Sequence, residues 1–149
     1  MSEQENAEGQ APKSGLEAFK GLVDYVNESF ARAYDIVEVV PANFIYEIAN
    51  SPEINDRDKA GIIRSLSEIG LMVDLLKTGY DNGIGVKFLD DPDNVKKFTA
   101  IMSGLIALYR GFRNGEMVKA TELSLAIDDV AYDLRVFFIH YMKSINTPE

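Results

Sequence analysis

The sequence of 149 residues contains no cysteine, no tryptophan and a single histidine. Without cysteine, the chain has no disulfide framework, no thiol nucleophile, no iron–sulfur cluster and no cysteine-based zinc site. A single histidine also excludes every site that needs two imidazoles, including the di-iron bundles that carry Glu-x-x-His on two helices. The composition therefore excludes most familiar metalloenzymes, and we expect neither a cofactor nor a metal.

Positive charge is also scarce, because 15 Lys and Arg stand against 24 Asp and Glu, which gives a formal net charge of −9 at pH 7. This excess repels phosphate backbones and anionic lipid headgroups, so we predict no direct binding to nucleic acid or to a membrane. The first residues show no signal or transit pattern, and no apolar run approaches the roughly 20 residues of a membrane span. We predict a cytoplasmic protein whose partner is another protein with a basic surface.

The start of the chain is polar and acidic. Residues 1–13 carry almost nothing that can be buried, which predicts a flexible acidic tail ahead of a single domain over residues 14–146. Ser14 and Glu17 have the spacing of a capping box, which predicts a helix start. The helix is expected to continue to Pro41, because the residue before a proline is pushed out of the helical conformation.

The same reasoning divides the rest of the chain. We predict a short helix over 41–50, a long helix from about Asp56 to Tyr80, an extended piece within 84–90, a third long helix from Asp91–Pro92, and a fourth long helix after a tight turn at Asn114–Gly115.

Apolar residues recur at alternating spacings of three and four in each long segment, which places them on one helical stripe. The predicted seams are Phe19, Val23, Val26, Phe30, Ala33, Val37 and Val40; Ile62, Leu66, Ile69, Val73, Leu76 and Tyr80; Phe98, Met102, Leu105, Tyr109 and Phe112; and Leu123, Ile127, Val130, Leu134, Phe137 and Tyr141. Seams of this length favour side-by-side packing. The sequence thus predicts an all-α protein in which four long helices form an antiparallel-type bundle with one short helix.

The third long helix carries a second stripe of small residues, Ala100, Gly104, Ala107 and Gly111. They fall within about 60° on a helical wheel, and interior glycine costs about 1 kcal/mol relative to alanine, so another backbone is expected to come close there. An internal partner helix is the favoured explanation. A contact between two copies in a homo-oligomer is the alternative.

The fourth long helix carries an acidic row, Glu122, Asp129 and Asp133, which shares one side with His140. His140 lies roughly 10 Å beyond Asp133 and cannot join the carboxylates at a metal ion. The row is explained most simply as a solvated face, and its functional alternative is a docking surface. Together with the small stripe, the row supplies our candidate protein-docking residues.

Around the histidine, the residues His140-Tyr141-Met142-Lys143-Ser144 resemble the His-x-Leu-Lys-Gly pattern of the histidine phosphotransfer domain, with Ser144 in the place of glycine. The resemblance covers five residues. It implies that His140 accepts a phosphoryl group and that Lys143, one turn later, steadies the group by its charge.

No nucleophile–base set, phosphate-binding loop or calcium loop emerges from the sequence. We therefore expect a non-catalytic protein-binding bundle that serves as an adaptor, regulatory subunit or assembly component; one form is an acidic inhibitor that mimics nucleic acid. The alternative is a histidine phosphotransfer-like or small-ligand-binding bundle that uses His140 or the loop before Asp91. Tyr132, Val136 and Ile139 form an additional apolar side, which makes the fourth helix either central or part of an interface.

Overall fold

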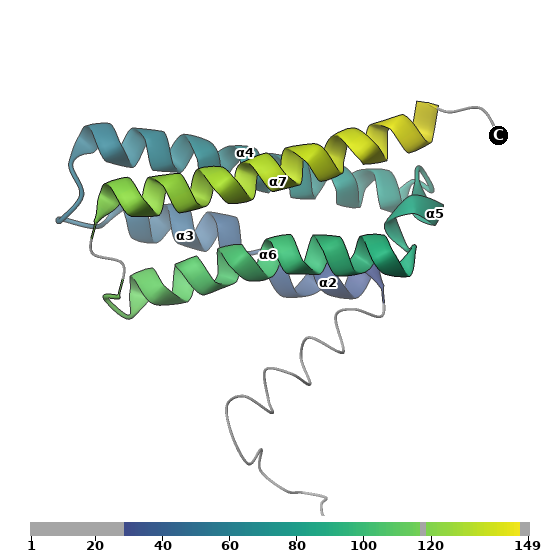
Figure 1. Cartoon of the computed structure of the whole chain (residues 1–149). Coiled ribbons are helices and arrows are strands. Elements are labelled where there is room, and N and C mark those ends of the chain that lie inside the picture. The colour runs from purple at the N-terminus through teal and green to yellow at the C-terminus, as the bar shows by residue number, and fades with distance from the viewer. Residues whose placement is uncertain (1–28, 117–118, 147–149) are drawn as a thin grey trace, which may run out of the picture.

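The computed structural model describes residues 29–116 and 119–146, and every regular element in these ranges is a helix. The helices are α2 (Phe30–Val37), α3 (Val40–Ala49), α4 (Asp56–Asp81), α5 (Val86–Leu89), α6 (Pro92–Arg113) and α7 (Ala120–Asn146) (Figure 1). The all-α prediction is confirmed. The predicted tail and the capping box at Ser14 lie outside the described residues. No helix within them is long and apolar enough to span a membrane.

The predicted continuous helix up to Pro41 is wrong at Ser29, where the backbone is extended (φ −161°, ψ 159°). The Ser29 hydroxyl accepts a hydrogen bond of 3.2 Å from the amide of Arg32 and so caps a new helix, α2. The break comes one turn before Pro41 rather than at the preceding residue, because Val40 already belongs to α3 and Pro41 has no amide proton to donate to the carbonyl of Val37. α2 therefore ends at Val37, and α3 begins at Val40 with Pro41 in its first turn.

The predicted extended piece within 84–90 is also wrong, because this segment contains the short helix α5. Gly83 and Gly85 have positive φ angles of 76° and 69°, and they turn the chain between α4 and α5. Asp90 then ties the turn to its surroundings by accepting from the Phe30 amide at 3.2 Å and from the Tyr80 hydroxyl at 2.8 Å. A short apolar run does not by itself distinguish a strand from a helix.

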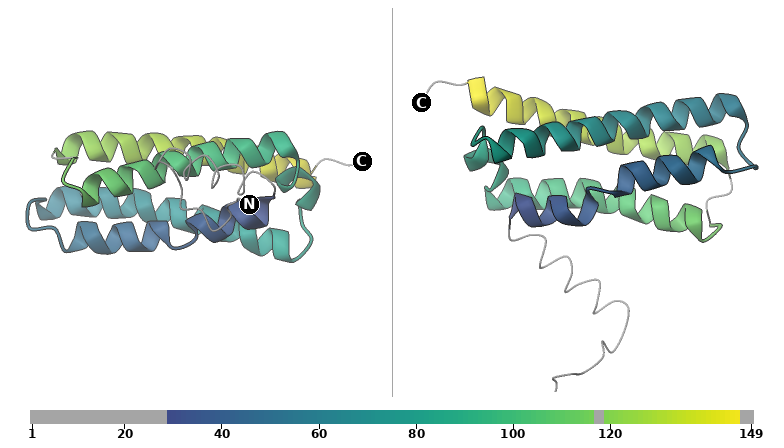
Figure 2. Two further views of the ribbon diagram at one scale, coloured as in Figure 1. Left: turned by 90° about the horizontal axis from the view of Figure 1, so that it is seen from below. Right: turned by 180° about the vertical axis from the view of Figure 1, so that it is seen from behind.

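The helices pack side by side along one long direction, with α2 and α3 following each other in a single row (Figures 1 and 2). α4 packs against α3 and α7, while α6 packs against α7, α2 and α3. α4 and α7 run in the same direction, whereas α6 runs opposite to α7 (Figure 1). α5 carries the chain across one end of the molecule, from α4 to α6.

The predicted seams form the core. Every seam residue within the described ranges is buried except Tyr80, Tyr109 and Phe112, which are partly buried. Aromatic rings link the helices: the Phe30 ring lies 5.0 Å from that of Phe98 and 5.3 Å from that of Tyr80, centroid to centroid. The seams therefore predicted both the helices and the side of each helix that faces inward.

Two glycines make room for Tyr141, which holds the end of α7 against the turn after α4. The Tyr141 hydroxyl donates to the carbonyl of Ile84 at 2.9 Å. A Cβ atom at Gly79 would overlap the Tyr141 hydroxyl oxygen, and one at Gly85 would overlap the ring. Glycine at these positions is thus a packing requirement for this contact.

Candidate functional site

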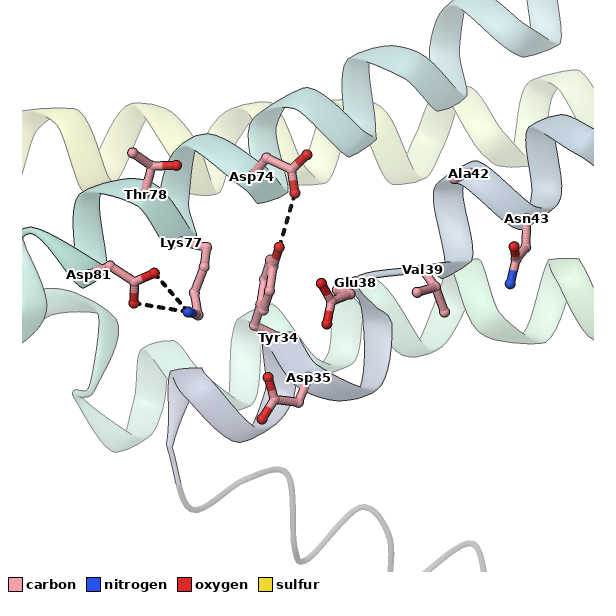
Figure 3. A pocket seen from close by; sticks show the side chains of 10 residues that line it. All are labelled: Tyr34, Asp35, Glu38, Val39, Ala42, Asn43, Asp74, Lys77, Thr78 and Asp81. Atoms are coloured by element: carbon pink, nitrogen blue, oxygen red, sulfur yellow. Dashed lines mark hydrogen bonds and ion pairs between the residues drawn. The ribbon is translucent and has the colours of Figure 1, made fainter.

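An acidic pocket lies where α2 passes into α3 against the side of α4 (Figure 3). It is an open depression with a volume of about 730 Å³. The break at Pro41 places the turn between the two helices beside the second half of α4. The lining residues are Tyr34, Asp35, Glu38, Val39, Ala42, Asn43, Asp74, Lys77, Thr78 and Asp81. They come from three helices and one turn.

Four carboxylates and one ammonium group line the acidic pocket. The Lys77 Nζ atom lies 2.9 Å from both carboxylate oxygens of Asp81 and 5.2 Å from the centroid of the Tyr34 ring. The Tyr34 hydroxyl donates to Asp74 at 3.1 Å. Figure 3 shows the Tyr34 ring beside Lys77, with its hydroxyl group directed toward Asp74.

The negative charge of the pocket exceeds what Lys77 balances. The side chains of Asp35 and Glu38 are exposed, and no hydrogen bond or salt bridge from the described residues reaches their carboxylates. Burial raises the pKa of Tyr34 to about 12, together with its hydrogen bond to Asp74 and the nearby negative charges. Tyr34 therefore remains a neutral hydrogen-bond donor at physiological pH. Asp74 accepts from Tyr34 and Asp81 pairs with Lys77, so Asp35 and Glu38 are the carboxylates that no side chain of the described residues engages.

The arrangement suits binding of a positively charged side chain. The pocket is a wide depression open to solvent, so a side chain on the surface of another protein can reach its carboxylates. Lys77 already shows an ammonium group held between a carboxylate and an aromatic ring, the two groups that best stabilise Lys or Arg. Within residues 29–116 and 119–146, no three Asp, Glu, His or Cys side chains are grouped closely enough to hold a metal ion.

Sequence reasoning missed the acidic pocket. Asp74 and Asp81 lie seven residues apart on α4, and Asp35 and Glu38 lie three apart on either side of the end of α2. Each pair alone is what a solvated helix surface carries. The available signal was that Glu38, Asp74 and Asp81 each directly follow a residue of an apolar seam, but only the packing of α2 beside α4 shows that they share one pocket.

The small stripe on α6 is mostly exposed to solvent. Ala100, Gly104 and Ala107 are exposed, and only Gly111 is buried. A Cβ atom at Gly104 would meet a single neighbour within 4 Å, Cγ2 of Val130 at 3.8 Å. Exposure at three positions, beside one ordinary contact with α7 at Gly104, does not test the internal-partner explanation or the homo-oligomer alternative, and both stay predictions.

The acidic row on α7 is exposed at Glu122, Asp129 and Asp133, as is His140. Gly104 lies near Val130, the residue after Asp129, so the small stripe and the acidic row lie on two neighbouring helices, α6 and α7. Neither the docking role of the two rows nor a phosphoacceptor role for His140 is tested by this placement, and both stay predictions.

A second concavity, of about 830 Å³, lies at the α5 end of the molecule. Two of its polar side chains are already engaged: Asp91 accepts from the amides of Asp93 and Asn94 at 3.1 and 3.3 Å, and the Asn94 side chain donates to the carbonyl of Phe88 at 3.0 Å. The prediction that Asp91 caps a helix is confirmed. These contacts make the loop a structural turn.

Compared with protein-family models, with curated proteins and with solved structures, the chain shows no match. Its function is therefore inferred from its own residues.

Proposed function

We propose that this chain is a non-catalytic cytoplasmic helical bundle with an acidic N-terminal tail, and that it binds a basic segment of another protein as an adaptor, regulatory subunit or assembly component. The observation that carries the proposal is the acidic pocket, in which four carboxylates and one ammonium group surround the ring of Tyr34. A Lys or Arg side chain from the partner fits this chemistry.

Lys77 is the internal precedent for such a ligand. Its ammonium group already lies near the Tyr34 ring and between the oxygens of Asp81. A second cation has Asp35, Glu38 and the remaining oxygen of Asp74 to approach, and its aliphatic stem has Val39 and Ala42 to cover.

Charge favours a protein as the partner. The net charge of −9 attracts basic protein surfaces over a distance and repels phosphate backbones. One form of the proposal is an inhibitor that occupies the basic groove of a nucleic-acid enzyme. For that form, binding must weaken steeply between low and high salt, since surface charges are screened.

The test uses a fluorescently labelled arginine-rich peptide and measures its Kd by anisotropy. The pocket variant combines Asp35→Asn, Glu38→Gln and Asp74→Asn; the amide of the last can still accept from Tyr34. The control variant combines Glu122→Gln, Asp129→Asn and Asp133→Asn, which removes the same number of charges from the exposed acidic row of α7.

We expect the pocket variant to weaken binding by about tenfold to a hundredfold, because each hydrogen bond to a charged group contributes roughly 1.5–3 kcal/mol. The control should lose far less, through the long-range field only. Equal losses in the two variants would show that the peptide senses net charge alone, and a larger loss in the control would assign docking to α7. Either result contradicts the pocket.

A further inference from the structure

One exposed side of the molecule is apolar rather than acidic, and it spans the paired helices α4 and α7. Leu71 and Leu75 of α4 and Leu125, Tyr132 and Ile139 of α7 are all exposed, with Leu125 62% and Tyr132 60% accessible. The three α7 residues are seven apart, so they form one stripe along the helix. We call these five residues the apolar face.

Two polar contacts between the helices show that the five residues share one face. The Ser65 hydroxyl donates to Asp128 at 2.6 Å, and Arg135 donates to Glu68 at 3.0 Å. Tyr132 and Ile139 lie within one turn of Arg135 on α7, while Leu71 lies one turn beyond Glu68 on α4. Apolar side chains therefore border the ion pair on both helices.

The charges on this side differ from those of the rest of the chain. Two of its carboxylates, Asp128 and Glu68, are each held by a group of the chain itself, while Glu122 and Asp129 of α7 are exposed at its edge. Arg57 and Arg64 of α4 are also exposed on this side, and no side-chain hydrogen bond or ion pair of the described residues engages them. This side therefore carries charges of both signs, and a partner surface that also carries both can match it.

A second copy of this chain has such a surface. α4 and α7 run in the same direction (Figure 1), and Ser65 contacts Asp128, so the N-terminal halves of the two helices lie at one end of the molecule. A two-fold axis parallel to the helices places α4 of one copy on α7 of the other. Arg57 and Arg64 then lie over the half of α7 that carries Glu122, Asp128 and Asp129.

The size of the face also suits a dimer. α4 has 26 residues and is therefore about 39 Å long, at 1.5 Å per residue. Two neighbouring helices, each about 10 Å wide, together cover a strip about 20 Å wide. Along the full length of α4 this strip has an area of about 800 Å², which is the area per partner in a standard stable interface.

We propose that two copies of this chain form a two-fold dimer through the apolar face, with the arginines of α4 opposite the acidic N-terminal half of α7. The acidic pocket lies beside α2 and α3, and Leu71 of the apolar face borders it, because Leu71 shares a shallow depression with Glu38, Ala42 and Asp74. The proposed dimer contacts do not use the carboxylates of the acidic pocket.

Sedimentation-velocity ultracentrifugation of the full chain tests the dimer over a concentration series. The wild type should sediment as a dimer, and Tyr132→Glu should weaken dimerisation by about 30-fold or more, as expected for a central interface residue. Tyr46→Glu is the control, because Tyr46 is equally exposed (66%) but lies on α3. Far-UV circular dichroism checks that both variants remain folded.

A monomeric wild type, or a dimer that Tyr132→Glu leaves unchanged, would overturn the proposal. The order of the helices has its own test. Arg64→Glu and Asp129→Arg should each weaken the dimer, and the double variant should recover it, because the reversed charges meet again across the interface. Failure of the double variant to recover would refute the placement of α4 on α7.

Discussion

Alanine substitutions at two glycines of the same helix should change the stability of the fold in opposite directions. Gly61 and Gly79 both lie in α4. A Cβ atom at Gly61 meets nothing within 4 Å, whereas one at Gly79 would overlap the hydroxyl oxygen of Tyr141. The two substitutions are chemically identical, so any difference between them reports their surroundings.

Alanine within a helix is about 1 kcal/mol more favourable than glycine, so Gly61→Ala should stabilise the fold by about that amount. At Gly79 the same gain is opposed by overpacking, which costs about 1–3 kcal/mol. Loss of the hydrogen bond from Tyr141 to Ile84 adds about 1 kcal/mol. Gly79→Ala should therefore destabilise the fold by about 1–3 kcal/mol.

Urea unfolding followed by circular dichroism measures both changes, and thermal unfolding should show shifts of about 2–4 °C per kcal/mol. Tyr141→Phe removes the oxygen that alanine at 79 would meet. The double variant should therefore be more stable than the sum of the two single effects predicts. The reasoning is refuted if Gly79→Ala stabilises the protein as Gly61→Ala does, or if the double variant is strictly additive.

Two smaller predictions concern Tyr34 and Gly104. Because the pKa of Tyr34 is raised to about 12 in the folded state, its contribution to stability is complete below pH 10 and is lost as the pH rises toward 12. Ultraviolet difference titration of the wild type against Tyr34→Phe measures this pKa, and Asp74→Ala should lower it; a pKa near 10 in the wild type would contradict the hydrogen bond from Tyr34 to Asp74. Gly104→Ala should raise the free energy of unfolding by about 1 kcal/mol, because its Cβ makes only an ordinary contact with Val130 at 3.8 Å; a loss of stability in urea unfolding would mean that the position is tightly packed.

The helices and their buried sides could be predicted because both depend on local pattern. The spacing of Leu123, Ile127 and Val130 determines which side of α7 is buried, and Asp91 and Pro92 start α6 by their own chemistry. Prediction failed at Ser29, whose hydroxyl can be either a helix surface group or a cap. Only the surrounding chain decides between these roles.

The candidate site was less predictable, because it depends on which helices become neighbours. Asp35 and Asp74 are far apart in the sequence and look like ordinary solvated residues until α2 packs beside α4. The small stripe around Gly104 stays a prediction for the same reason: its low bulk indicates a close approach, but the pattern does not tell whether the approaching surface belongs to the same chain.

The most direct test of the account is an NMR titration of the isotope-labelled full chain with the unlabelled arginine-rich peptide. If the peptide binds in the acidic pocket, its amide shifts should concentrate in residues 34–43 and 74–81, the segments that line the pocket. The shifts should also saturate with a single Kd. Shifts confined to residues 122–133 of α7, or spread evenly over the acidic surface without saturation, would contradict the account.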